Sequence, residues 1–157
     1  MDSVTAINTV RDSLRTNLQD PYVLAGSTAR PGNFWIFSDE PTAIGKFPII
    51  QLKKLDNPTK ILDIGYEYTE HERCFINIWF SSKNGFKVTI AGVEYSNAQL
   101  VEYYLGLIKR TLKAKAAVLH TAGAIGYHHM NTSPVEYDDA TQIYYGVVTC
   151  QVEYFVV

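Results

Sequence analysis

Two segments of the chain carry apolar residues at helical spacing, and the first lies at the N-terminus. Ser3 has the side chain of an N-cap, and Pro21 follows the last turn, where it stops a helix. The apolar positions between them recur every three or four residues: Val4, Ile7, Val10, Leu14 and Leu18. With polar residues on the opposite side, this pattern predicts an amphipathic helix that lies on a sheet or on a neighbouring element.

The second helical segment is longer, and it is predicted to be the central helix of the fold. Ser96 and Gln99 have the spacing of a capping box, which places the first turn. Basic residues crowd the last turns from Lys109 to Lys115, where positive charge complements the helix dipole. The apolar stripe that this helix is expected to bury consists of Leu100, Val101, Tyr104, Leu105, Ile108 and Leu112.

Alternating apolar and polar residues predict antiparallel strands between the two helices. Residues 47–52 are the first candidate, and Pro48 confines that strand to a sheet edge or to a strand start. Leu62–Tyr68 and Cys74–Phe80 alternate with period two, so each is expected to bury one face. The short charged link Thr69–Glu72 between them is predicted to be a hairpin loop.

The second half of the chain adds a short strand, a loop and a long terminal strand. Phe86–Ile90 follows an Asn-Gly turn signal and is predicted to be the short strand. The polar, Gly-containing residues 120–134 show no period and are predicted to be a loop. Residues 141–157 then have a strand pattern, in which Gly146 suggests a bulge.

The terminal strand is too long for a compact domain of this size. Fully extended, it would span roughly 50 Å at about 3.3 Å per residue, whereas a domain of this length is only about 30–35 Å across. It is therefore expected to bend at Gly146, to pair with residues 135–139 in a projecting hairpin, or to run into a neighbouring subunit. Together the elements predict one α+β domain over residues 1–157, in which a mostly antiparallel sheet is packed by the N-terminal helix and the long central helix, with a long C-terminal strand or hairpin.

Aromatic residues are the most unusual part of the composition, with 11 Tyr, 7 Phe and 2 Trp in 157 residues. They suit strands, and they are also over-represented at subunit interfaces. In the irregular connection over residues 27–45, the run Phe34-Trp35-Ile36-Phe37 is apolar on both sides of any strand it forms. Such a run is either fully buried or covered by another subunit. The residues expected at a partner interface are Phe34, Trp35, Phe37, Tyr144 and Tyr154.

Composition narrows the class of protein. The hydrophobic share of 46% is ordinary for a globular protein, and a net charge of -2 gives no basic field for nucleic acid. Neither a signal peptide nor a membrane span is expected, because the N-terminus lacks the charged and apolar regions of a signal and no apolar run reaches about 18 residues. Cys74 and Cys150 lack metal spacing, so they are expected to be buried thiols of a protein made in a reducing cytosol.

Candidate chemistry is sparse. Three histidines in residues 120–129, with Asp138 downstream, could in principle gather a metal, but adjacent histidines on an extended segment point to opposite sides, and a solvated loop is expected instead. Glu70-His71-Glu72 resembles an acid–base cluster. On a hairpin tip, however, it would be exposed to solvent, where no burial shifts the pKa values of its side chains. Nucleophile and phosphate-loop motifs are missing. The chain is therefore not expected to be an enzyme, and no catalytic, cofactor-binding or metal-ligating residue is assigned.

The order of these elements resembles the tail-terminator (tail-completion) proteins of tailed bacteriophages and archaeal tailed viruses. Those small α+β proteins open with an amphipathic helix. They continue with strands similar to residues 47–52 and Arg73–Trp79, a long helix similar to Ser96–Lys115 and a final strand similar to Ile143–Phe155. The likeness covers most of the chain and lies in the order of elements, without an invariant motif, and the connections 27–45 and 120–134 are longer than that pattern has.

The resemblance implies a structural protein of the virion tail or neck that is assembled in the host cytoplasm. Such proteins form a ring, usually of six subunits, which caps the tail tube, ends its polymerisation and joins it to the head-side connector. The implied partners are further copies of the chain, the tail-tube protein and a head–tail connector or neck protein, with DNA only passing through the lumen. No cofactor and no membrane contact are implied.

Three other functions stay open from the sequence. Another neck, head-completion or tail-tube protein would use the same interface physics and would differ in its position in the particle. A small hydrolase or transferase would need a deep pocket with convergent polar groups, such as His120, His128 and Asp138. A nucleic-acid-binding module would retain DNA in a salt-sensitive way.

Overall fold

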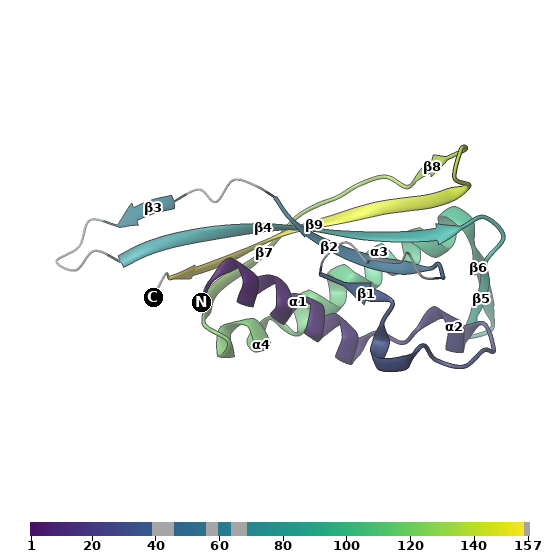
Figure 1. Ribbon diagram of the computed structural model, residues 1–157, viewed down its shortest axis with the longest axis horizontal. Coiled ribbons are helices and arrows are strands. Elements are labelled where there is room, and N and C mark those ends of the chain that lie inside the picture. The colour runs from purple at the N-terminus through teal and green to yellow at the C-terminus, as the bar shows by residue number, and fades with distance from the viewer. Residues whose placement is uncertain (39–45, 56–59, 64–68, 156–157) are drawn as a thin grey trace.

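The computed structural model describes residues 1–38, 46–55, 60–63 and 69–155 of the chain. In these residues a twisted, mostly antiparallel sheet lies on a layer of helices, so the predicted α+β class is confirmed (Figure 1). The helices are α1 (Ser3–Asn17), α2 (Pro21–Leu24), a 3-10 turn (Pro31–Asn33), α3 (Asn97–Ala114) and α4 (Ala116–Thr121). The strands are β1 (Ile36–Phe37), β2 (Ile49–Lys54), β3 (Lys60–Asp63), β4 (Thr69–Lys83), β5 (Lys87–Ile90), β6 (Val93–Ser96), β7 (Ala124–Thr132), β8 (Glu136–Asp138) and β9 (Ile143–Phe155).

The long strands β4 and β9 form the centre of the main sheet. They pair in antiparallel fashion without a register shift, from His71 opposite Phe155 to Lys83 opposite Ile143. The strand order is β1-β2-β4-β9-β7, with β3 paired to the start of β4 and β8 paired to the start of β9. The two central strands extend past the helices beneath them, and the β3–β4 hairpin projects at one end (Figure 1).

The first helix forms where the apolar spacing predicts it, but a different residue caps it. The backbone N–H of Thr5 donates to Oδ1 of Asp2 at 2.6 Å, so Asp2 is the N-cap and Ser3 is the first helical residue. An aspartate at this position satisfies an otherwise free N–H and also complements the helix dipole. The prediction that Ser3 caps the helix was therefore wrong by one residue.

The central helix buries the predicted stripe in full. The buried residues of α3 are Leu100, Val101, Tyr104, Leu105, Ile108 and Leu112. Ser96 occupies the N-cap position, yet its side chain makes no capping hydrogen bond, so the predicted capping box does not form. Instead Oδ1 of Asn97 accepts the backbone N–H of Gly85 at 2.9 Å, which ties the helix start to the turn after β4.

The core lies between α1, α3 and one face of β4 and β9. The ring of Tyr104 stacks on Phe80 at 4.5 Å between centroids and meets the edge of Trp35 at 6.1 Å. Cys74 and Cys150 are free and buried, as predicted, and burial raises the pKa of the two thiols to about 11 and about 12. These thiols are therefore neutral and unreactive at physiological pH.

One predicted turn is wrong, and the strand after another pairs elsewhere. Thr69–Glu72 is the beginning of β4 rather than a hairpin loop, and the candidate strand Leu62–Tyr68 is described only as far as Asp63, within β3. The Asn-Gly turn does follow β4, but β5 pairs with β6 in a separate two-stranded sheet and not with β4. The turn signal was local, whereas the choice of pairing partner depends on tertiary contacts.

Residues 120–134 are not a loop, because they contain the end of α4 and the whole of β7. β7 is an edge strand with polar residues on both sides, so it lacks the apolar alternation that would have revealed it. Among the three fates proposed for the terminal strand, pairing with residues 135–139 is observed, since β8 pairs with β9. The predicted bulge at Gly146 is absent, because Gly146 lies opposite Phe80 in uninterrupted register.

Candidate assembly surface

The α-helices of the described residues lie on one face of the main sheet, and no described helix covers the other face (Figure 1). Side chains of β4 and β9 alternate between the two faces, so half of them point away from the helices. We name this half, with its neighbours on β1 and β2, the open face. It includes Phe37, Gln51, Lys53, Arg73, Phe75, Asn77, Trp79, Ser81, Tyr145, Val147, Thr149, Gln151 and Glu153.

The centre of the open face combines aromatic and polar side chains, since the hydroxyl of Thr149 donates to Oδ1 of Asn77 at 2.7 Å between the positions of Phe75 and Trp79. Phe37, Gln51, Trp79 and Val147 occupy opposite register positions on four neighbouring strands. The ring of Trp79 lies 6.0 Å from that of Tyr145, and all these side chains are half-buried although no described helix covers them. A partner that covered Phe37, Trp79 and Val147 would remove their apolar surface from water. Each Å² of apolar surface buried in this way stabilises association by about 25 cal/mol.

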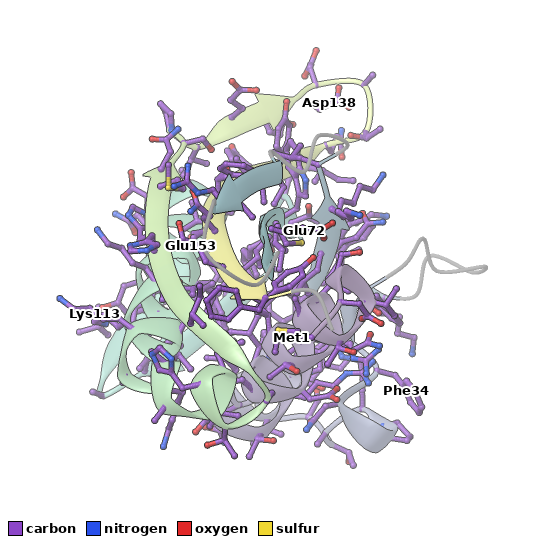
Figure 2. All side chains as sticks on the ribbon, turned by 90° about the vertical axis from the view of Figure 1, so that its left-hand side faces the viewer. Met1, Phe34, Glu72, Lys113, Asp138 and Glu153 are labelled. Atoms are coloured by element: carbon purple, nitrogen blue, oxygen red, sulfur yellow. The ribbon has the colours of Figure 1, made fainter. Side chains whose placement is uncertain are left out.

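One end of the open face is charged. The carboxylate of Glu153 lies 3.0 Å from Nε of Arg73 and 3.9 Å from Nε2 of His128, and it accepts a hydrogen bond from the side chain of Gln151. Figure 2 looks at the molecule from this end and labels Glu153. At the other end the hydroxyl of Tyr145 donates to Glu136 at 2.7 Å. Aromatic side chains together with hydrogen-bonding and charged groups are common at protein–protein interfaces.

Two of the predicted interface residues belong to the core of the subunit. Trp35 and Tyr154 are 0% exposed. Trp35 packs edge-on against Tyr104, and the hydroxyl of Tyr154 donates to Glu72 at 3.1 Å. Their assignment to a partner interface is therefore corrected: the chain itself encloses them, and replacing Trp35 would test folding rather than assembly.

The other three predicted residues are accessible to different degrees. Phe34 is 62% exposed and lies at the periphery of the molecule, with Cζ of Arg15 5.8 Å from its ring centroid (Figure 2). Phe37 is half-buried and lies on the open face. Tyr144 is half-buried on the helix side, where it contacts the exposed Tyr137 at 4.4 Å between ring centroids. The structure thus brings only Phe37 into the open face.

Sequence analysis did not assign three of the aromatic residues of the open face to an interface. Phe75 and Trp79 alternate with the buried residues of β4, and Tyr145 does the same on β9. The signal was present, because β4 is apolar on both sides of its alternation, as the run Phe34–Phe37 is. Which of two apolar runs becomes enclosed depends on the elements that pack against it. Those elements are set by the tertiary fold and not by the run itself.

The histidines that could have gathered a metal have separate local partners. Nδ1 of His120 lies 3.0 Å from the carbonyl oxygen of Ala124, and Nε2 of His129 lies 2.8 Å from the hydroxyl of Thr132. Asp138 accepts hydrogen bonds from Ala140 and Thr141 within its own turn. The described residues contain no group of three His, Cys, Asp or Glu side chains placed to hold a metal ion.

Two shallow grooves border α1. The larger, of about 370 Å³, lies between α1 and β2, where Lys54 donates to the hydroxyl of Ser3 at 3.0 Å and Arg11 donates to that of Ser38 at 2.9 Å. The smaller, of about 310 Å³, lies between α1 and α4 and is mostly apolar. Neither groove brings together the residues His120, His128 and Asp138 that an enzyme was expected to use.

Comparison with known proteins gives a distant structural likeness. No protein-family model matches the chain, and no curated protein matches it. The chain is similar to a solved chain of the "Virion of native gene transfer agent (GTA) particle", with a TM-score of 0.45 and 11% identity, over 96% of this chain and 94% of that chain. A likeness this remote carries no argument about function. None of the helices in the described residues has the length and apolar character to span a membrane.

Proposed function

We propose that the chain is a structural protein of a virion and, more specifically, a tail terminator. In this proposal it forms a homo-oligomeric ring, usually of six subunits, that caps the tail tube and joins it to the head-side connector. The ring assembles in the host cytoplasm and lies at the tail or neck of the particle. The chain works by binding its neighbours and has no catalytic role.

The observation that carries the proposal is the face of the main sheet that no described helix covers, on which Phe37, Phe75, Trp79 and Tyr145 are half-buried. Trp79, Phe75 and Phe37 would stay partly in water in an isolated subunit. Protein surfaces with contiguous aromatic side chains and a polar rim are typical of binding surfaces. The order α1, β2, β4, α3 and β9 also agrees with the order on which the resemblance to tail terminators rests.

The partners follow from the same role. Further copies of the chain close the ring, the tail-tube protein meets one side of it, and a connector or neck protein meets the other. A ring that closes by rotation needs two different contact surfaces on each subunit. A net charge of -2 suits a lumen through which DNA passes without being retained.

The experiment is to measure the mass of the purified chain in solution and to mix it with the tail-tube protein encoded in the same genome. A closed ring of about six copies that stops tube elongation, seen by electron microscopy, is expected. A ring that incorporates into the tube or binds only the connector would indicate another tail or neck component. A stable monomer over the whole accessible concentration range would overturn the proposal.

A further inference from the structure

The β3–β4 hairpin is joined to the rest of the described sheet only through the β4 side of its base. β3 pairs with Thr69–Glu72 of β4 and with no other described strand, and of that stretch only His71 and Glu72 also pair with β9. Figure 1 shows the hairpin projecting beyond the helices. An isolated two-stranded hairpin is marginally stable in water at best, so a neighbouring element would have to stabilise it.

At the opposite edge of the sheet, no described strand pairs with the outer side of β7. β7 pairs with β9 on one side only, and Figure 2 shows it along one flank of the molecule with no described strand beyond it. Register shifts between Ala124 and Gly126 and between His129 and Asn131 leave a regular run of four residues, Gly126–His129. An edge strand turns half of its backbone N–H and C=O groups outward, where they are free to pair with another strand. The run has the same length as the four-residue strand β3.

The surroundings of these two edges carry opposite charge. The exposed side chains of Lys109, Arg110 and Lys113 lie on the part of α3 that flanks β7, and Lys109 is close enough to His129 to help burial lower the pKa of that imidazole. In Figure 2, Lys113 lies on the same flank as β7. The paired parts of the hairpin, residues 60–63 and 69–72, contain one lysine and three carboxylates, a formal charge of -2.

We propose that β3 of one subunit adds to the Gly126–His129 edge of β7 in a second copy of the chain. The four-residue lengths match, each strand has an edge that pairs with no other described strand, and the sequence of the hairpin is acidic where the flank of α3 is basic. Donor and acceptor lie at different places on the subunit, so the contact is head-to-tail and repeats from copy to copy. The inference deepens the proposed function, because it rests on the chain forming a ring and names the strands that join its subunits.

The first test is site-specific crosslinking. In the double variant Asp63→Cys/His128→Cys, a short bismaleimide should join neighbouring subunits into covalent dimers and larger multimers. Cys74 and Cys150 are buried with raised pKa values, so they should not react, and each single variant should stay monomeric on a denaturing gel. The proposed contact is overturned if the double variant gives no multimers beyond those of the single variants.

The second test is a charge swap. Lys109→Glu/Lys113→Glu should weaken association about tenfold or more, and adding Asp63→Lys/Glu70→Lys on the same chain should restore it. Lys87→Glu, on the separate β5–β6 sheet, is the control and should assemble normally, and circular dichroism should show every variant folded. Unchanged assembly of the charge-reversed variant would overturn this contact while leaving the proposed function intact. A monomeric wild-type chain would overturn both.

Discussion

At the scale of single residues, the pair Asp20 and Arg30 fastens three separate parts of the chain. Asp20 caps α2 by accepting the backbone N–H of Tyr22 at 3.0 Å, and its carboxylate accepts hydrogen bonds from Arg30 at 2.7 to 3.2 Å. Arg30 also donates to the carbonyl oxygens of Lys46 and Pro48, and its guanidinium lies 4.1 Å from the ring centroid of Tyr22. With Asp20 only 3% exposed, this charge is satisfied entirely by the protein.

This pair should make stability depend on pH. Burial alone would raise the pKa of Asp20, but hydrogen bonds from Arg30 and from two backbone amides outweigh it and lower the pKa below its ordinary value. The stabilisation is therefore complete above the unfolded pKa of about 3.9 and is lost as the pH falls through the folded pKa. Asp20→Asn should cost about 2–3 kcal/mol at pH 7, as for a hydrogen bond to a charged group.

The measurement is urea unfolding of wild type and Asp20→Asn from pH 7 to pH 3. The difference in free energy of unfolding should shrink below about pH 4. The pKa values of Asp2 and Asp138 are also lowered, but both residues are present in the two proteins, so their effect cancels in the difference. A difference that stays constant from pH 7 to pH 3 would contradict the assigned role of the Asp20 carboxylate.

At the scale of elements, the packing of α3 on β9 depends on one missing side chain. Gly146 lies opposite Phe80 in the centre of the sheet, directly above Leu105 and Val101 of the helix. A Cβ atom added at Gly146 would lie 2.5 Å from Cδ1 of Leu105 and 3.4 Å from Cγ1 of Val101. The glycine thus permits the close approach of the helix to the sheet rather than a bend of the strand.

Gly146→Ala should therefore destabilise the chain by about 1–3 kcal/mol, since overpacking forces α3 and β9 apart. The matched control is Gly106→Ala on α3, where nothing lies within 4 Å of an added Cβ, and where alanine should instead stabilise the helix by about 0.5–1 kcal/mol. Urea unfolding of both variants measures the two effects. Equal effects of the two substitutions would show that helix–sheet distance is not set at Gly146.

Sequence patterns identified the elements whose burial is one-sided. The stripe of α3 and the alternation of β4 and β9 were predicted residue by residue, because a large apolar side chain at a fixed period has only one way to face the core. β7 was missed because it is an edge strand without regular apolar alternation, which forms by pairing with β9. The Asn-Gly signal predicted the turn before β5 but not its partner β6, because such a turn fixes a reversal of the chain and not the strand that pairs after it.

The sequence predicted that a partner-binding surface exists, but not which residues form it. An excess of aromatic residues over what the core needs was visible in the composition, and it led to the expectation of a partner. The individual interface residues could not be predicted, because Trp35 and Trp79 both lie in apolar runs. Only the fold buries Trp35 in the core and places Trp79 on the open face. For the same reason Tyr154 was predicted to contact a partner but lies in the core.

At the scale of the whole molecule, the sheet has two unequal faces. One buries Ile76, Ile78 and Val148 completely against α1 and α3. The other presents Phe75, Trp79 and the remaining side chains of the open face without a described helix over them. A two-layer α+β protein can leave one face of an antiparallel sheet in water when that face is polar. Here Phe37, Phe75, Trp79 and Tyr145 lie among the polar side chains, which is why we assign this face to a contact with other subunits.

Replacing the two large open-face residues of β4 should separate assembly from folding. Phe75→Thr/Trp79→Thr keeps strand-forming side chains, so circular dichroism should stay native and the loss in free energy of unfolding should be small. Removal of two aromatic contacts should nevertheless raise the dissociation constant of the assembly by tenfold or more, because such residues contribute about 2 kcal/mol or more each at interfaces. Val118→Thr on α4, which is 46% exposed, is the matched control and should leave the mass of the assembly unchanged. Sedimentation of the three proteins over a range of concentrations decides the matter: wild-type-like assembly of the double variant would show that the open face faces solvent in the particle, and the subunits would then have to join through their edges alone.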